Sequence, residues 1–347
     1  MRLGKDRGCR PLVGAARALR WGFLIGLGAL AACSSTPPLA TLDRFDRGAF
    51  SFESYEGLTW ADILQQRLAR KPKVRIPAEL LWPAGASGRR PVMIIMHGSG
   101  GLRQEREYRY ARELNKEGIA AVVLDSFSPR GVATTGGQQE RVTTSTMVGD
   151  VYALLNLLQT HPQVDVDRIG LMGFSKGGSV TVFALDEQVR SALAVGGARF
   201  AVGVAFYPGC VTQLKRPKPT GAPLFMLLGE QDSYTPAVQC ERQAASIRAA
   251  GGTVTVLKYA GAHHGWDSPS PLQFTRFDYS YGNCASEVDE SGAVTDLRTG
   301  RRLDSPDAIR AAIEACGTRG VWVGANADAA RQSLADLKTI LKQTLAR

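Results

Sequence analysis

A pentapeptide in the middle of the chain has the residue types and spacing that acyl-transfer chemistry needs. Residues 173–177 read Gly-Phe-Ser-Lys-Gly, the G-x-S-x-G pattern, between an apolar run at 169–172 and a segment of helical character. A serine on so sharp a strand-to-helix turn needs small neighbours, which Gly173 and Gly177 provide. The turn would display the Ser175 hydroxyl at a helix N-terminus, where free N–H groups favour developing negative charge. The pattern therefore predicts Ser175 as a nucleophile.

A serine nucleophile needs a base, and the chain has four histidines. His97 lies in a glycine-rich loop, where we expect it to brace the loop, and His161 precedes a proline in a predicted surface turn. His263 and His264 follow an apolar run at 253–259, at the point where a strand of a doubly wound sheet would end. The base is therefore expected to be one of this adjacent pair.

A carboxylate that could orient the base lies between the serine and the histidines. Asp232 comes shortly after the apolar run 223–228, with Glu230 as a minor alternative beside it. Asp125 also follows a predicted strand, but it precedes the serine in the chain. With Asp232 the order is nucleophile, acid, base, which is the order found in α/β-hydrolases. We therefore predict Asp232 as the acid.

The elements that must position these residues alternate along the chain. Continuous apolar runs predict strands at 92–96, 119–124, 169–172, 200–206, 223–228 and 253–259. Helical patterns are found at 103–116, 148–158, 179–185, 236–250 and 327–345. Buried strands separated by helices predict an α/β fold with a mostly parallel, doubly wound sheet covered by helices on both faces. We expect one such domain over residues 50–347, with a charged insertion at about 281–319.

Six motifs together resemble the dienelactone hydrolase-like branch of the α/β-hydrolases, over residues 74–345. They are MHGSGG at 96–101, LDSFSPRG at 124–131, GFSKGG at 173–178, FYPGC at 206–210, GEQDSYTPA at 229–237 and YAGAHHG at 259–265. The resemblance implies an α/β-hydrolase fold and cleavage of an ester or related acyl bond. It also implies that His264 is the base, because the family's YxGAxH pattern places the catalytic histidine two residues after the alanine. His263 then fills the variable position.

An oxyanion hole requires two backbone N–H donors beside the nucleophile. We expect one from Lys176, directly after Ser175, and the other from Ser99 in the glycine-rich loop. The chain departs from the family twice: Ser175 stands where the name-giving enzymes have a cysteine, and residues 265–268 lack the arginine that holds their substrate's carboxylate. True dienelactone hydrolysis is therefore not expected. Arg130 and Lys176 are alternatives for holding an anionic group, beside structural roles.

The first 33 residues have the anatomy of an export signal. A basic region ends at Arg20, and an uncharged run follows at 21–32. This run is shorter than the roughly 20 residues that span a bilayer, but it suits a signal-peptide core. Its end, Leu-Ala-Ala-Cys, resembles a bacterial lipobox, so Cys33 would become the lipid-modified first residue of the mature protein; a plain cleaved signal or a short buried helix is the alternative. Residues 34–49 are predicted as a polar tether. We expect the protein in the bacterial cell envelope, on the periplasmic face of the outer membrane, with a secreted or soluble periplasmic location as the alternative.

Four cysteines remain when Cys9 and Cys33 are set aside: Cys210, Cys240, Cys284 and Cys316. An even number in an exported protein without any CxxC spacing favours disulfides over metal ligation. Sequence order and local setting suggest the pairs Cys210–Cys240 and Cys284–Cys316, with reduced buried thiols as the alternative. The second pair would staple the insertion at its base.

The net charge of +10, from 42 basic and 32 acidic residues, does not indicate nucleic-acid binding. The first 33 residues contain six basic residues and one acidic residue, so they carry 6 − 1 = +5, and the rest of the chain carries the other +5. The basic residues after residue 33 are interspersed with acidic ones, and no nucleic-acid recognition motif accompanies them.

We expect a serine hydrolase, carboxylesterase-like rather than peptidase or thioesterase, that acts on a small molecule and needs no metal or cofactor. The alternative is a non-catalytic envelope lipoprotein that uses a hydrolase fold for binding.

Overall fold

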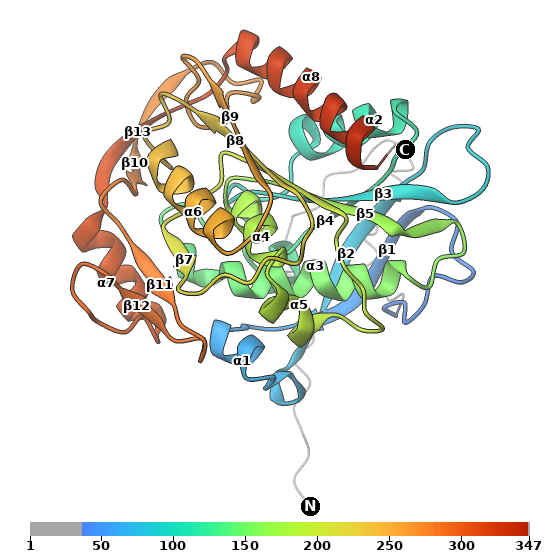
Figure 1. The fold of residues 1–347 in the computed structure, drawn as a ribbon, viewed down its shortest axis with the longest axis horizontal. Helices are drawn as coiled ribbons and strands as arrows, with labels where there is room; N and C mark the ends of the chain where they lie inside the picture. Colours follow the sequence, from blue (N-terminus) through green and yellow to red (C-terminus); the bar gives the residue numbers. More distant parts are fainter. Residues whose placement is uncertain (1–36, 346–347) are drawn as a thin grey trace, which may run out of the picture. The chain divides into compact units, whose positions relative to one another are not determined.

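The central element of the fold is an eight-stranded sheet. The computed structural model describes residues 37–345, which belong to one compact unit. Along the sheet the strands follow the order β1-β2-β4-β3-β5-β6-β8-β9 (Figure 1). Their bounds are β1 Gly48–Tyr55, β2 Lys73–Leu81, β3 Arg90–Met96, β4 Ala120–Leu124, β5 Val164–Phe174, β6 Val202–Phe206, β8 Leu224–Gly229 and β9 Val254–Tyr259. β1 pairs antiparallel with β2 and β2 with β4, and all the other neighbours are parallel, which confirms the predicted mostly parallel sheet.

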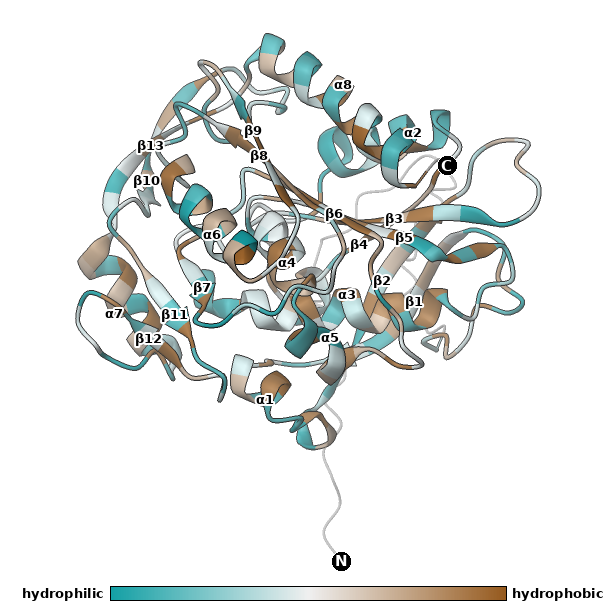
Figure 2. Ribbon diagram, viewed as in Figure 1, coloured by the Kyte–Doolittle hydropathy of each residue, from teal (hydrophilic) through white to brown (hydrophobic). Residues whose placement is uncertain are grey.

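Side chains of alternate strand residues enter two separate cores. Ile94, Val122 and Leu171 face one core, while Ile95, Val123 and Met172 face the other. The first core is covered by α3 (Thr144–Leu158), α4 (Lys176–Ala184), α5 (Glu187–Leu193) and α6 (Ala237–Ala249). The second is covered by α2 (Arg109–Lys116) and α8 (Ala327–Thr344). Burial of both faces explains why the central strands are continuously apolar, as the brown strands in Figure 2 show.

The strand register brings the loops that carry the predicted site to one edge of the sheet. Phe174 at the end of β5 pairs with Phe206 at the end of β6. Phe206 pairs in turn with Leu227 of β8, and Gly229 at the end of β8 pairs with Tyr259 at the end of β9. The segments that follow β5, β6, β8 and β9 therefore begin side by side.

Several smaller elements surround this frame. A short helix, α1 (Trp60–Leu64), lies between β1 and β2. A three-stranded sheet contains β7 (Thr212–Leu214), β11 (Ser286–Val288) and β12 (Val294–Asp296). A two-stranded sheet contains β10 (Gln273–Ser280) and β13 (Thr318–Val323), and α7 (Pro306–Cys316) lies between β12 and β13. The predicted insertion at 281–319 thus contains β11, β12 and α7, and its ends are joined by the Cys284–Cys316 disulfide.

The structure bears on three local expectations: the start of the folded part, the turn at His161 and the export signal. The folded part begins before residue 50, because Leu42 is fully buried and its N–H donates to Thr160 Oγ1 at 2.7 Å. The predicted surface turn at His161 is present, with Thr160 and Pro162 exposed, but the His161 side chain itself is buried and its ring stacks on that of Trp82. Cys33 and the predicted signal lie outside the described residues. Within the described residues, no helix is both long enough and apolar enough to cross a membrane.

Candidate active site

Ser175 lies on a strained turn between β5 and α4. Its backbone has φ 54° and ψ −114°, in the region of positive φ that side chains other than glycine seldom adopt. The turn is held from below by a hydrogen bond in which the Ser175 N–H donates to the Phe206 carbonyl at 2.9 Å. Such strain persists only where the surrounding structure fixes the backbone, and it is typical of functional sites.

The glycines around Ser175 are required by close backbone approaches. A Cβ on Gly173 would overlap the carbonyl of Gly177, and a Cβ on Gly177 would overlap the carbonyls of Met96 and His97. The start of α4 therefore packs directly on the end of β5 and on the loop after β3, which requires glycine at both positions.

The structure brings Ser175, His264 and Asp232 into one hydrogen-bonded chain. His264 Nε2 lies 2.9 Å from Ser175 Oγ, and His264 Nδ1 lies 2.8 Å from Asp232 Oδ2. The imidazole and the carboxylate are both buried. A base within hydrogen-bond reach of a serine, itself oriented by a carboxylate, is the geometry that activates a hydroxyl for nucleophilic attack.

Thr235 also belongs to this chain, although the sequence analysis did not single it out. Its Oγ1 lies 3.0 Å from Asp232 Oδ2 and 3.1 Å from His264 Nδ1. The N–H groups of Tyr234 and Thr235 both donate to Asp232 Oδ1 at 2.8 Å. The carboxylate is thus held by three donors from its own turn. The available signal was the spacing, because a threonine three residues after an aspartate can reach the same carboxylate.

Tyr207 supports the imidazole from another side and was also missed. It follows β6 with φ 36°, and its ring packs edge-on against His264 with centroids 4.8 Å apart. The Tyr207 hydroxyl donates to Asp267 Oδ1 at 2.6 Å. Burial is the main reason that the pKa of Tyr207 is raised well above its ordinary value, so this hydroxyl stays protonated and acts as a donor.

The structure places the rival candidates for acid and base elsewhere. His97 is fully buried; its Nδ1 lies 2.9 Å from the Gly98 carbonyl and its Nε2 accepts from Ser126 N–H at 3.1 Å, as expected of a residue that braces the loop. Asp125 Oδ1 accepts from the N–H groups that follow it in its own turn. Glu230 is exposed, and the ring of His263 lies near Trp322, with centroids 6.2 Å apart.

The two residues expected to supply an oxyanion hole, Ser99 and Lys176, both line the same cavity as Ser175. A Cβ on Gly98 would lie 2.9 Å from the Phe174 carbonyl and 3.3 Å from Ser175 Cβ, so the loop after β3 approaches the nucleophile closely. The loop that contains Ser99 and the start of α4 at Lys176 therefore both border the turn that carries Ser175.

The loop that contains Thr135 and Gln139 holds both Ser99 and Lys176. Thr135 N–H donates to the Ser99 carbonyl at 2.8 Å, and Ser99 Oγ donates to Gln139 Oε1 at 3.1 Å. Lys176 Nζ donates to the Gln139 carbonyl at 2.8 Å and lies 3.4 Å from Thr135 Oγ1. Burial lowers the pKa of Lys176 to about 7, against an opposing effect of the Glu140 charge.

Arg130, the other candidate for binding an anion, is occupied by protein groups. It forms a buried ion pair with Asp150, with Nη1 at 2.8 Å from Oδ2 and Nη2 at 2.9 Å from Oδ1. It also donates to the Ser126 and Tyr55 carbonyls. These contacts assign Arg130 a structural role in joining β1, α3 and the loop after β4.

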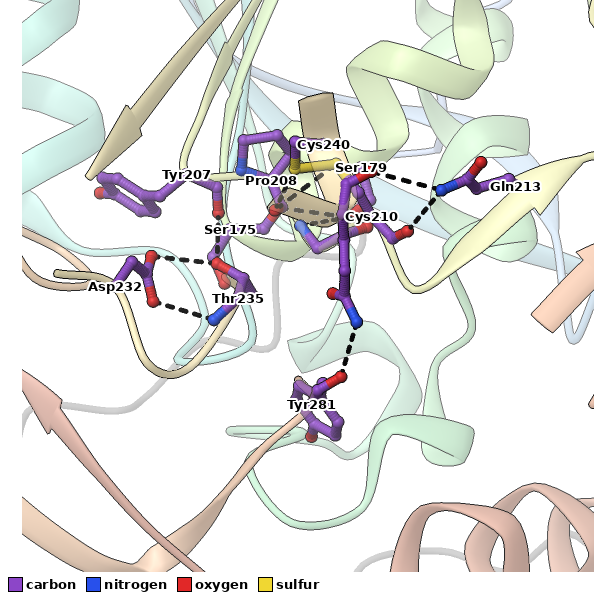
Figure 3. Close-up of a disulfide and its surroundings, with 12 residues drawn as sticks. Ser175, Ser179, Tyr207, Pro208, Cys210, Gln213, Asp232, Thr235, Cys240 and Tyr281 are labelled. Carbon is purple, nitrogen blue, oxygen red and sulfur yellow. Dashed lines mark hydrogen bonds between the residues drawn. A yellow bond between two sulfur atoms is a disulfide. The ribbon is translucent and has the colours of Figure 1, made fainter. Parts of the chain in front are cut away.

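The Cys210–Cys240 disulfide links the supports of the nucleophile and the acid (Figure 3). Cys210 ends the loop after β6, whose Gly209 N–H donates to Ser179 Oγ of α4 at 3.0 Å. Cys240 lies in α6, directly after the turn that contains Asp232 and Thr235. Both disulfide pairings suggested by the sequence are therefore present.

A large cavity opens at Ser175. Its volume is about 640 Å³, within the range of cavities that bind small molecules. Its walls come from α1, from the loop that precedes α3, from α4 and from the 281–319 insertion. Among residues 37–345, no group of three or more metal-ligating side chains could hold a metal ion.

Comparison with known proteins identifies the family of the chain. The dienelactone hydrolase family matches residues 76–292, more than half of the chain. A candidate carboxymethylenebutenolidase of Synechocystis is 23% identical over 214 residues, covering 56% of this chain and 85% of that protein. An uncharacterised 31.7 kDa protein of Escherichia coli, encoded in the traX-finO intergenic region, is 26% identical over 126 residues, which are 36% of this chain and only 43% of that relative.

The fold has a counterpart among solved structures. A dienelactone hydrolase-like promiscuous phosphotriesterase from metagenomic libraries superposes with a TM-score of 0.52 at 15% identity, covering 86% of this chain and 99% of that one. At this identity the likeness concerns the fold alone. The family match and the α/β-hydrolase architecture agree, and we conclude that this chain belongs to the dienelactone hydrolase family.

Proposed function

We propose that the protein is a serine hydrolase that cleaves an ester bond of a small molecule through an acyl-enzyme on Ser175. The observation that carries this proposal is the hydrogen-bonded chain from Ser175 Oγ through His264 to Asp232, at the mouth of a cavity. Membership of the dienelactone hydrolase family supports hydrolysis as the reaction class.

The acylation step follows from these distances. Ser175 Oγ attacks the ester carbonyl carbon while its proton passes to His264 Nε2, 2.9 Å away. The second ring nitrogen, 2.8 Å from Asp232, keeps its proton and donates a hydrogen bond to the carboxylate, which stabilises the imidazolium that forms. When the tetrahedral intermediate collapses, the carbon–oxygen bond of the ester breaks and the Nε2 proton passes to the departing alkoxide.

Deacylation repeats these steps with water as the nucleophile. His264 takes a proton from the water, the hydroxide attacks the acyl carbon, and Ser175 Oγ leaves with the proton. The negative charge on the carbonyl oxygen in both halves is assigned to the backbone N–H groups of Ser99 and Lys176. An oxyanion donor of this kind contributes about 10²–10³ in rate. The proposed steps use only these groups and water.

We also propose that the protein is exported to the cell envelope, where Cys33 holds a lipid. The two disulfides support an oxidising compartment. Expression of the tagged chain in a bacterium, followed by fractionation, tests this: the wild type should be recovered with membranes and Cys33→Ala should not. Recovery of both proteins in the same soluble fraction would contradict the lipid anchor.

The test of the catalytic proposal is the loss of ester hydrolysis in Ser175→Ala. Removal of the nucleophile should lower kcat for p-nitrophenyl ester hydrolysis by about 10⁴–10⁶. Ser191→Ala is the matched control, because Ser191 is exposed and its hydroxyl donates to Glu187 on α5. Circular dichroism should show both variants folded. Turnover by Ser175→Ala within tenfold of the wild type would overturn the proposal.

A further inference from the structure

The cavity at Ser175 extends along α4. Ser175, Ser179 and Phe183 all line it, and they are spaced by four residues. Residues four apart lie on the same face of a helix, so the cavity follows one face of α4 from the nucleophile onward. Eight residues at 1.5 Å each give a length of about 12 Å from Ser175 to Phe183.

Apolar side chains form part of the cavity wall. The ring of Trp60 in α1 lies 4.3 Å from that of Phe183, centroid to centroid, and both rings line the cavity. Ile309, Ala312 and Ile313 of α7 also line it. Apart from the indole N–H of Trp60, these side chains offer no hydrogen bonds, so a substrate group beside them gains free energy mainly by leaving water.

The charged side chains of the cavity wall that lie closest to the nucleophile have protein partners, while Arg141, Arg302 and Asp304 line the cavity as exposed groups. Arg130 is paired with Asp150, and Glu140 lies 3.3 Å from Arg310 of α7. The remaining charge close to the nucleophile, Lys176, donates to the Gln139 carbonyl. This pairing favours an uncharged group along α4 over an anionic one.

The α7 wall is held in place by contacts at several points. The Cys284–Cys316 disulfide closes the segment that contains α7. Gly292 packs against the backbone of Ala61 in α1, where a Cβ would overlap it, and Gln65 Nε2 donates to the Ser291 carbonyl at 2.6 Å. The insertion is therefore tied to α1, and both elements contribute residues to the cavity wall.

We propose that the preferred substrates are esters with one long apolar arm, which lies along α4 toward Trp60 and Phe183 and packs against the apolar side chains of the cavity wall. This inference rests on the proposed function. Three bonds of an extended chain span ~3.8 Å, so ~12 Å accommodates an arm of about nine bonds. Each buried methylene improves binding by up to about fourfold, so a long arm should outweigh a short one decisively.

The experiment measures kcat/KM of the full-length protein across two ester series. One series, p-nitrophenyl acetate to decanoate, lengthens the acyl arm, and the other, ethyl acetate to octyl acetate, lengthens the alcohol arm. We expect kcat/KM to rise at least tenfold with length in one of the two series. A fall beyond the four-carbon member in both series would overturn the inference.

Ala312→Trp places a large ring on the α7 wall of the cavity and should act on long substrates alone. It should lower kcat/KM at least tenfold for the eight-carbon member of the preferred series and change that for the two-carbon member by less than twofold. Ala315→Trp is the matched control, since Ala315 is exposed on the same helix and is absent from the cavity wall. Equal losses on long and short esters, or no loss on either, would contradict the proposed position of the arm.

Labelling of Ser175 by a fluorophosphonate probe separates the two proposals. Labelling with hydrolysis of short esters only, or of no ester in either series, would overturn the long-arm inference and leave the nucleophile intact. Absence of labelling in the folded protein would overturn the proposed function and this inference together.

Discussion

The buried lysine beside the nucleophile gives the protein a stability that should depend on pH. Lys176 is 7% exposed, and its Nζ is held by the Gln139 carbonyl and Thr135 rather than by a carboxylate. Burial lowers its pKa from 10.5 to about 7, with the Glu140 charge opposing. The folded state therefore disfavours the charged form of this side chain relative to the unfolded state.

The direction of the pH dependence follows from this difference. Below about pH 7 both states hold the proton, and the full cost of burying the charge is present. Between pH 7 and 10.5 the folded state has released its proton while the unfolded state retains it, so the free energy of unfolding rises with pH. From pH 6 to pH 9 this one group should raise the free energy of unfolding by ~2–3 kcal/mol.

Urea unfolding at pH 6 to 9, with the disulfides oxidised, measures this effect in the wild type and in Lys176→Met. The variant removes the titrating group, so its advantage over the wild type should shrink by ~2–3 kcal/mol between pH 6 and pH 9. Lys342→Met, at an exposed position on α8, should follow the wild type at every pH. Parallel profiles for the wild type and Lys176→Met would refute the reasoning.

Three further predictions concern the support of the site. Thr235→Val removes a hydroxyl that contacts both Asp232 and His264, and should lower kcat/KM about tenfold to hundredfold, the loss of one hydrogen bond to a charged group; an unchanged kcat/KM would show that the hydroxyl positions neither. The double variant Cys210→Ala, Cys240→Ala removes a link between two residues with a sequence separation of 30, and should lower the free energy of unfolding in urea by ~3–4 kcal/mol. An unchanged urea midpoint and slope would argue against a role of this disulfide in constraining the unfolded chain. Gly177→Ala should cost at least ~3 kcal/mol or abolish folding, because its Cβ would overlap two carbonyls, and a variant with wild-type thermal stability would show that this contact can relax.

The central sheet could be predicted because its strands are buried on both faces. In a run such as residues 119–124 every residue is apolar, which is typical of a strand buried on both faces. Each predicted apolar run corresponds to a strand of the sheet. The short strands β7, β11 and β12, each of three residues, were not predicted, since so few residues carry no periodicity. The antiparallel pair β1 and β2 was also missed, although its residues alternate in burial as a half-exposed sheet edge does.

The residues of the candidate site also differ in how far the sequence predicts them. Ser175 and Asp232 could be found from the sequence because a glycine-flanked turn and a carboxylate after a strand are local patterns, whereas the choice of His264 over His263 rested on the family resemblance. Tyr207 acts through contacts between segments far apart in sequence. Thr235 combines a local contact to Asp232, which its spacing could have signalled, with a contact to His264 that depends on the fold. The cavity wall at α7 depends on where the insertion folds back, which no local pattern encodes.

The most direct test of the central claim is to locate the residue that a fluorophosphonate modifies. After reaction of the folded protein, peptide mapping by mass spectrometry should find one adduct, on Ser175. His264→Ala should slow the labelling by at least a hundredfold, because the hydroxyl loses the base 2.9 Å away. An adduct on another residue, or a folded protein that resists the probe, would contradict the assignment of Ser175 as the nucleophile.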